Sequence, residues 1–248
     1  MFVACTARNI MLKNFFSSDP TYQQMTSVYE KKDALVAIGV YILTLLLFLG
    51  AGFLHFILGV RLTIELAIVL LLFVVVAIVH LRKQKLNSVG FTLRHFKKAL
   101  LFGAVLAVII SLPTVILHIM AGHHWTDFDT LFRNIFYFRN IFYQLVLCLQ
   151  EELMFRGYIQ TRLYAIIKSD VSVSIICGLM FTSIHIPFHL FSYGHALGFF
   201  HGNTYWLVQV FIMHFLFNFL YRKYNSLTAP TTCHFLSNLI PVLFIAAQ

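Results

Sequence analysis

The sequence predicts an all-α polytopic membrane protein with about seven transmembrane helices and an active site inside the helix bundle. Composition is the first reason: 60% of the residues are hydrophobic and only 11% are charged, whereas soluble domains are roughly 45–50% apolar and about 25% charged. The second reason is that the apolar residues form runs long enough to cross a bilayer, which takes about 20 residues. The third is that a few ionisable side chains interrupt these runs, as expected of a site buried in a bundle.

Seven apolar runs follow one another along the 248 residues. Together they need about 140 residues, so only short loops remain and there is no room for a separate soluble domain. The fourth run is long enough to continue past the bilayer. We also predict a loop over residues 192–204. The predicted spans are residues 34–58, 62–81, 99–120, 135–168, 171–191, 205–221 and 231–246.

The chain is expected to have three parts. Residues 1–33 form a polar N-terminal segment that can lie on the membrane surface. Residues 34–134 hold the N-terminal transmembrane helices. Residues 135–248 hold the transmembrane helices that carry most of the ionisable side chains found within spans.

The net charge of +9 resides mainly in the loops. Basic loops of a membrane protein are typical of the side that faces anionic lipid, so the charge indicates no nucleic-acid partner. With the N-terminus inside, the inner segments hold 14 Lys and Arg residues and the outer segments hold 3. By the positive-inside rule we expect the N-terminus in the cytoplasm and the C-terminus outside.

The fourth span contains two adjacent carboxylates, Glu151 and Glu152, and an arginine, Arg156. Each such charge at mid-bilayer costs about 2.5–3.5 kcal/mol, which a plain membrane anchor would not carry. An alternative is a helix start at the membrane surface, where Glu in the first turn is ordinary. Strongly apolar sequence on both sides favours a functional site inside the bundle.

The spacing of these three residues gives them different roles. Glu152 and Arg156 are four residues apart, so on a helix they share a face and can pair. Glu151 lies about 100° away around the helix and has no intrahelical cation. We therefore expect Glu152 to be neutralised and structural, and Glu151 to be free for chemistry.

Other polar side chains lie inside the fifth and seventh spans. His185 follows Phe181 by four residues, and Pro187 disturbs the helix beside it. His234 and Asn238 share one face of the last span. Both can donate hydrogen bonds to a developing oxyanion. Alternatively, His185 could be a packing residue, and the His234–Asn238 pair could form hydrogen bonds between helices.

Three histidine arrangements compete with this interpretation. His214 and Asn218 have the same spacing on the sixth span, and spacing alone does not choose between the pairs. His185 and His189 have a spacing that suits zinc, but Pro187 lies between them and no HExxH motif is present. His123 and His124, near Asp127 and Asp129, could bind a metal but are more typical of a loop. We predict no metal and no cofactor, with zinc as the alternative if Glu151 and two histidines converge.

Three motifs, taken in order, resemble those of a known family. Glu151, Glu152 and Arg156 are similar to its EExxxR motif, Phe181 and His185 to FxxxH, and His234 and Asn238 to HxxxN. The family is CPBP, the CAAX proteases and bacteriocin-processing enzymes, also called the Abi family of intramembrane proteases. The resemblance covers about residues 140–245, which makes residues 135–248 a CPBP-like catalytic core. A family-like turn at residues 226–230 precedes His234 and favours it over His214. Asn218 stands where the family often has a small Gly, which leaves a minor role open for His214 or Asn218.

The resemblance implies a metal-independent glutamate peptidase. Glu151, helped by His185, would activate a water, and His234 and Asn238 would hold the carbonyl oxygen as it becomes negative. Glu152 and Arg156 would orient the helix, and Phe181 would be a further supporting residue of the site. The substrate would be a membrane-associated peptide or protein, either a bacteriocin or signal peptide, as in bacterial members, or a prenylated protein, as in eukaryotic ones.

The compact chain resembles bacterial members, so we expect an integral protein of a bacterial cell membrane. Two other functions compete. The first is a non-enzymatic immunity or scaffold protein that binds a peptide or partner, which would tolerate Glu151→Gln. The second is a transporter with a proton-relay carboxylate, which the lack of an inverted repeat disfavours.

Overall fold

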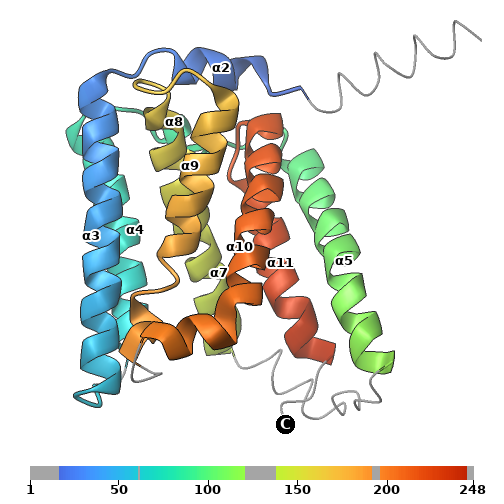
Figure 1. The fold of residues 1–248 in the computed structure, drawn as a ribbon. Coiled ribbons are helices and arrows are strands. Elements are labelled where there is room, and N and C mark those ends of the chain that lie inside the picture. The colour runs from blue at the N-terminus through green and yellow to red at the C-terminus, as the bar shows by residue number, and fades with distance from the viewer. Residues whose placement is uncertain (1–16, 61, 121–137, 192–195, 245–248) are drawn as a thin grey trace, which may run out of the picture.

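The computed structural model describes residues 17–60, 62–120, 138–191 and 196–244, and over these residues the chain is helical without a strand. Long helices stand side by side in a bundle, and a short helix lies across its upper end (Figure 1). The elements are α2 (Pro20–Thr26), α3 (Lys31–Phe56), α4 (Thr63–Leu81), the 3₁₀ turn η1 (Leu86–Val89), α5 (Phe96–Met120), α7 (Phe138–Glu152), the π-helix η2 (Leu153–Ile159), α8 (Gln160–Leu163), α9 (Asp170–Ser183), the 3₁₀ turn η3 (Phe188–Phe191), α10 (Ala196–Tyr224) and α11 (Thr228–Phe244).

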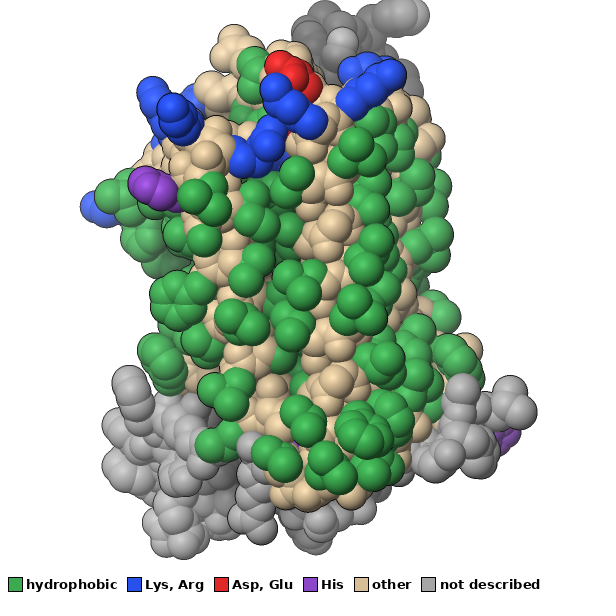
Figure 2. All heavy atoms as spheres, turned by 90° about the vertical axis from the view of Figure 1, so that its left-hand side faces the viewer, with side chains coloured by type: hydrophobic (Ala, Val, Ile, Leu, Met, Phe, Trp, Pro, Cys, Tyr) green, Lys and Arg blue, Asp and Glu red, His purple; other side chains and the backbone are tan. Residues whose placement is uncertain are grey.

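The architecture confirms an all-α polytopic membrane protein. Within the described ranges, five helical segments are long and apolar enough to cross a membrane, namely Lys31–Phe56, Thr63–Leu81, Phe96–Leu117, Asp170–Phe191 and Gly198–Tyr224. Hydrophobic side chains cover the face that Figure 2 shows, below a group of Lys and Arg side chains. The helices α7 and α11 are shorter, so the number of seven spans and the division into three parts stay predictions.

The described part of the polar segment before α3, from residue 17 onward, docks on the bundle. Tyr22 of α2 is buried, and its ring packs edge-on against Tyr164 and Tyr221 at centroid distances of 6.2 and 6.0 Å. Asp19 accepts a hydrogen bond from the backbone N–H of Thr21 and pairs with Arg94 at 3.3 Å. Helix α2 is therefore bound to the bundle end by both apolar and charged contacts.

The predicted helix over 135–168 is not continuous. A π-helix interrupts it directly after Glu152, with the N–H of Gln160 donating to the carbonyl of Phe155, five residues back. The carbonyl of Gly157 accepts from the side chains of Thr161 and Arg162, at 2.7 and 2.8 Å. These side chains compete with the backbone for that carbonyl, which supports the wider turn. The helix then ends at Leu163, and such wide turns are common at functional sites.

The predicted loop over 192–204 is wrong from Ala196 onward, where α10 begins. The first turns of α10 run across the lower end of the bundle before the helix turns along it (Figure 1). Phe199 explains why these residues are helical despite their glycines. Its ring is buried and stacks on His189 at a centroid distance of 6.3 Å, so apolar burial holds the segment in place.

The π-helix is packed tightly against the turn that follows α4. A Cβ atom on Gly157 would lie 2.5 Å from the carbonyl oxygen of Val89. Arg162, which is fully buried, donates to the carbonyl of Ser88 at 3.1 Å. The segment that carries Arg156 is therefore held in place by contacts with the turn η1.

Gly157→Ala should destabilise the protein, because the new methyl group meets backbone that cannot move freely. Overpacking of this kind costs about 1–3 kcal/mol. Thermal unfolding in detergent would show a lower Tm than in the wild type. Gly39→Ala in α3 is the matched control, because a Cβ atom at that position would have nothing within 4 Å, and it should stabilise the helix by about 0.5–1 kcal/mol. Equal Tm values for the two variants would contradict the tight packing of η2 on η1.

Candidate active site

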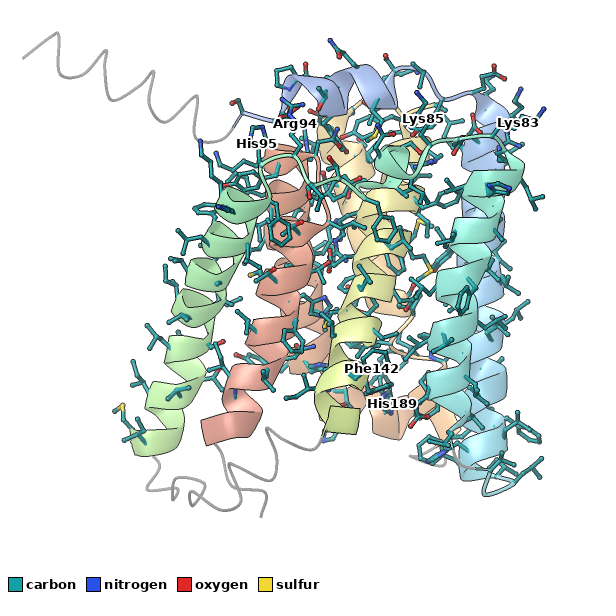
Figure 3. The ribbon with its side chains drawn as sticks, turned by 180° about the vertical axis from the view of Figure 1, so that it is seen from behind. Lys83, Lys85, Arg94, His95, Phe142 and His189 are labelled. Atoms are coloured by element: carbon teal, nitrogen blue, oxygen red, sulfur yellow. The ribbon has the colours of Figure 1, made fainter. Side chains whose placement is uncertain are left out.

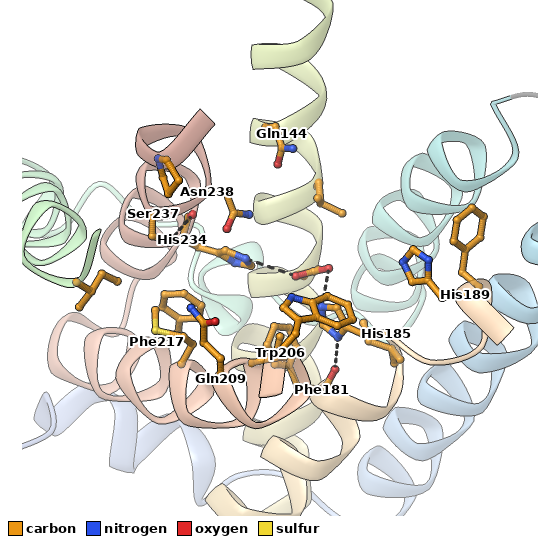
Figure 4. A pocket seen from close by; sticks show the side chains of 18 of the residues that line it. Gln144, Phe181, His185, His189, Trp206, Gln209, Phe217, His234, Ser237 and Asn238 are labelled. Carbon is orange, nitrogen blue, oxygen red and sulfur yellow. Dashed lines mark hydrogen bonds and ion pairs between the residues drawn. The ribbon is translucent and has the colours of Figure 1, made fainter. Parts of the chain in front are cut away.

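One cavity of about 740 Å³ lies inside the bundle, with walls from α3, α4, α5, α7, α9, α10 and α11. Most of its lining is apolar, such as Phe48, Ile68 and Met213. Its polar lining includes Glu151, His185, His234 and Asn238. The four residues expected to perform chemistry thus come together from α7, the turn after α9, and α11. Figure 4 labels three of them, His185, His234 and Asn238.

Glu151 lies between two imidazoles. Its carboxylate oxygens are 3.9 Å from Nε2 of His185 and 3.8 Å from Nε2 of His234. These separations exceed a direct hydrogen bond, but an oxygen atom at about 2.8 Å from each partner fits between them. Only 5% of Glu151 is exposed, so the carboxylate faces the cavity from a largely closed environment.

The last turn of helix α9 orients His185, which follows it. Its Nδ1 lies 2.9 Å from the carbonyl oxygen of Phe181, four residues back. A carbonyl only accepts hydrogen bonds, so Nδ1 must be the donor, and Nε2 of the neutral ring carries the lone pair that faces Glu151. Helix α9 ends at Ser183, and the backbone N–H of His185 bonds to Thr182 in a tighter turn. The disturbed helix expected before Pro187 is therefore present.

Glu152 is fully buried and serves two partners. One oxygen pairs with Nε of Arg156 at 3.2 Å, which confirms the pair expected from the spacing. The other lies 2.9 Å from Nδ1 of His234 on α11. Spacing along the chain does not predict this second contact, because it joins residues from different helices.

Aromatic rings enclose the buried guanidinium of Arg156. Its central carbon lies 4.1 Å from the centroid of Phe181 and 5.2 Å from that of Phe217, and such contacts stabilise a desolvated cation. Phe217 also stacks on the ring of His234 at 4.6 Å with an interplanar angle of 21°. Sequence reasoning missed Phe217, which looks like any apolar residue of the sixth span.

The competing pair on α10 lies outside the cavity. Asn218 donates to Oγ of Ser174 at 2.8 Å and accepts from the side chain of Gln160. Gln160 also donates to the hydroxyl of Tyr22 at 3.2 Å. These bonds join α2, α8, α9 and α10, so Asn218 is placed as a structural link. His214 is fully buried beside Phe181, at a ring distance of 6.0 Å.

His189 lines the cavity but stands apart from the two histidines around Glu151 (Figure 4). Its ring packs on Phe199 and Trp206. Glu151, His185 and His234 do converge, but among the described residues no three His, Cys, Asp or Glu side chains are grouped so that they could hold a metal ion. His123 and His124 lie outside the described residues, and a metal-independent site stays a prediction.

One comparison with known families finds a match that spans the candidate residues. Residues 133–240 match the model of a family described as type II CAAX prenyl endopeptidase Rce1-like. This similarity agrees with the resemblance to the CPBP family that the three motifs indicate. The match includes α7, α9 and α10 and all the candidate residues. No curated protein and no solved structure matches the chain. The similarity to this family supports a membrane endopeptidase.

The two adjacent glutamates should differ sharply in their effect on stability. Glu152→Gln leaves the buried guanidinium of Arg156 without its carboxylate, and breaking a buried ion pair in this way costs about 3–5 kcal/mol. Glu151→Gln removes no such partner and should stay within about 1 kcal/mol of the wild type. Thermal unfolding of both variants in detergent measures the difference. A Glu152→Gln variant as stable as Glu151→Gln would refute the structural role of the pair.

Proposed function

We propose that the chain is a glutamate-dependent intramembrane endopeptidase that hydrolyses a peptide bond of a membrane-associated peptide or protein without a metal. The position of the Glu151 carboxylate carries this proposal. It lies in a cavity between Nε2 of His185 and Nε2 of His234, at 3.9 and 3.8 Å. A water bound there can contact a base on one side and lie next to a substrate carbonyl on the other.

Glu151 acts as the general base in the proposed reaction. It removes a proton from the water while the water oxygen bonds to the carbonyl carbon of the substrate. His185 orients the water through Nε2, which its bond to the Phe181 carbonyl leaves as an acceptor. Glu151 then passes the proton to the amide nitrogen as the C–N bond breaks, which releases an amine and a carboxylate.

His234 and Asn238 hold the carbonyl oxygen as it becomes negative. Nδ1 of His234 is bonded to Glu152 at 2.9 Å, so Nε2 donates to the carbonyl oxygen when the ring carries both protons. Asn238 lines the cavity one helical turn further on, with its amide 3.6 Å from Sγ of Cys148. Loss of one oxyanion donor costs about 10²–10³ in kcat in known cases.

We further propose that the protein lies in a bacterial cell membrane with its N-terminus in the cytoplasm and its C-terminus outside. The uneven distribution of Lys and Arg supports the orientation. The substrate is a membrane-anchored peptide segment, and the apolar walls around Glu151 suit apolar side chains next to the scissile bond.

Cleavage by reconstituted protein tests the proposal. A panel of membrane-proximal fluorogenic peptides, including prenylated ones, would be incubated with wild type, Glu151→Gln and His214→Ala. We expect Glu151→Gln to lose cleavage, because an amide cannot take the proton. His214→Ala should retain it per folded molecule, because His214 does not line the cavity. Indifference to a chelator is expected, whereas loss with chelator and rescue by zinc would overturn the metal-free mechanism. Equal activity of Glu151→Gln and wild type would refute the role of Glu151.

Phe217 should act as a positioning residue through its stack on His234. Phe217→Leu should lower kcat about ten- to a hundredfold, because small displacements of a reacting group have large effects, with little change in KM. Phe217→Tyr keeps the ring and should restore most of kcat. Phe215→Leu is the control, since Phe215 lies on the same helix but outside the cavity lining. An equal loss of kcat in Phe217→Tyr and Phe217→Leu would speak against ring stacking.

A further inference from the structure

Apart from the buried Arg156 and from Arg139 in the first turn of α7, the described Lys and Arg residues gather at one end of the bundle. They lie at the start of α3, in the stretch from the end of α4 to the first turn of α5, around α8 and at the end of α10. Figure 2 shows several at the upper end, and Figure 3 labels Lys83, Lys85 and Arg94 there. The described residues at the other ends of α3, α4 and α5 include no Lys or Arg. The gathered residues are Lys31, Lys32, Arg82, Lys83, Lys85, Arg94, Lys97, Lys98, Arg162, Lys168, Arg222 and Lys223.

Charge asymmetry of this kind orients a membrane protein. Short loops rich in Lys and Arg stay on the cytoplasmic side, where anionic lipid also attracts them. We call the end that holds these residues the basic end. By this rule the basic end faces the cytoplasm.

The cavity extends toward the opposite end. It is lined by Ile64 near the start of α4, Leu117 near the end of α5, His189 of η3 and Tyr205 in the first half of α10. Figure 3 places His189 at the lower end, far from the labelled basic residues. Tyr205 is 84% exposed, so the cavity reaches the surface of the molecule on that side.

The way from Glu151 to the basic end is closed. Each residue of η2 is buried, and Leu153, Met154, Phe155 and Arg156 are 0% exposed. The turn η1 packs against η2, with the Val89 carbonyl in contact with Gly157. The described lining of the cavity includes no residue of η1 or η2, so the path from the basic end to Glu151 is closed along this segment.

The lining also bears on the chemistry of the substrate. The described lining residues include no Lys or Arg, and Glu151 is the acidic residue among them. The free C-terminal carboxylate of a short peptide would find no Lys or Arg among these lining residues and would approach the like charge of Glu151. A scissile bond inside a longer chain meets neither difficulty.

We propose that the substrate enters from the non-cytoplasmic side and is an internal segment of an exported, membrane-anchored polypeptide. The cleavage part of this inference rests on the proposed peptidase function, but the orientation of the cavity does not. A prenylated C-terminus stays in the cytoplasmic leaflet, behind the closed η2 segment. It is thus the wrong substrate for this orientation.

Cysteine labelling tests the orientation without any activity. In a Cys5→Ser background the remaining cysteines, Cys148, Cys177 and Cys233, are buried. One reporter is His201→Cys, exposed on the first turns of α10 and outside the cavity lining, and the matched one is Lys85→Cys at the basic end. In intact spheroplasts a membrane-impermeant maleimide should label His201→Cys. Lys85→Cys should be labelled only after the membrane is permeabilised. The reverse pattern overturns the proposal.

Cleavage in sealed vesicles tests the entry side. The probe is a lipid-anchored fluorogenic peptide with a polar tail, added from outside, with the scissile bond internal or three residues from a free carboxylate. Right-side-out vesicles should cleave the internal form directly, whereas inside-out vesicles should cleave it only after detergent is added. Cleavage by intact inside-out vesicles alone, or preference for the free carboxylate, contradicts the inference. No cleavage even in detergent would refute the peptidase function and leave the labelling result to decide the orientation.

Discussion

Burial of the Arg156 charge is the constraint on which the rest of the site depends. A guanidinium that is 0% exposed inside an apolar bundle is costly unless it is paired. Glu152 supplies the carboxylate, and Phe181 and Phe217 supply the faces of two rings. Because Glu152 also binds His234, the same pair that neutralises the cation fixes an imidazole on another helix. The same carboxylate thus contributes to the stability of the bundle and to the orientation of the site.

The π-helix makes this arrangement possible. It begins directly after Glu152 and carries Arg156 within a widened turn. Arg162 and Thr161 bind the carbonyl of Gly157, and Gly157 allows the turn after α4 to pack against it. The two glutamates sit at the junction between a regular and a widened helix, so one faces the cavity while the other faces the buried cation.

Much of this could be predicted from the sequence, and what could not has a physical reason. The membrane fold follows from composition, and the Glu152–Arg156 pair follows from spacing within one helix. The convergence of Glu151, His185, His234 and Asn238 in one cavity matches what the motifs indicate. The π-helix, the helical start of α10 and the contacts of Phe217 depend on tertiary packing, which periodicity along a single segment does not report.

Helix α10 touches both imidazoles around Glu151. Trp206 lies edge-on against His185 at 5.3 Å, and Phe217, three turns later, stacks on His234. A displacement of α10 would therefore shift both rings together. Substitutions on α10 that leave every charged residue unchanged can thus alter the surroundings of Glu151.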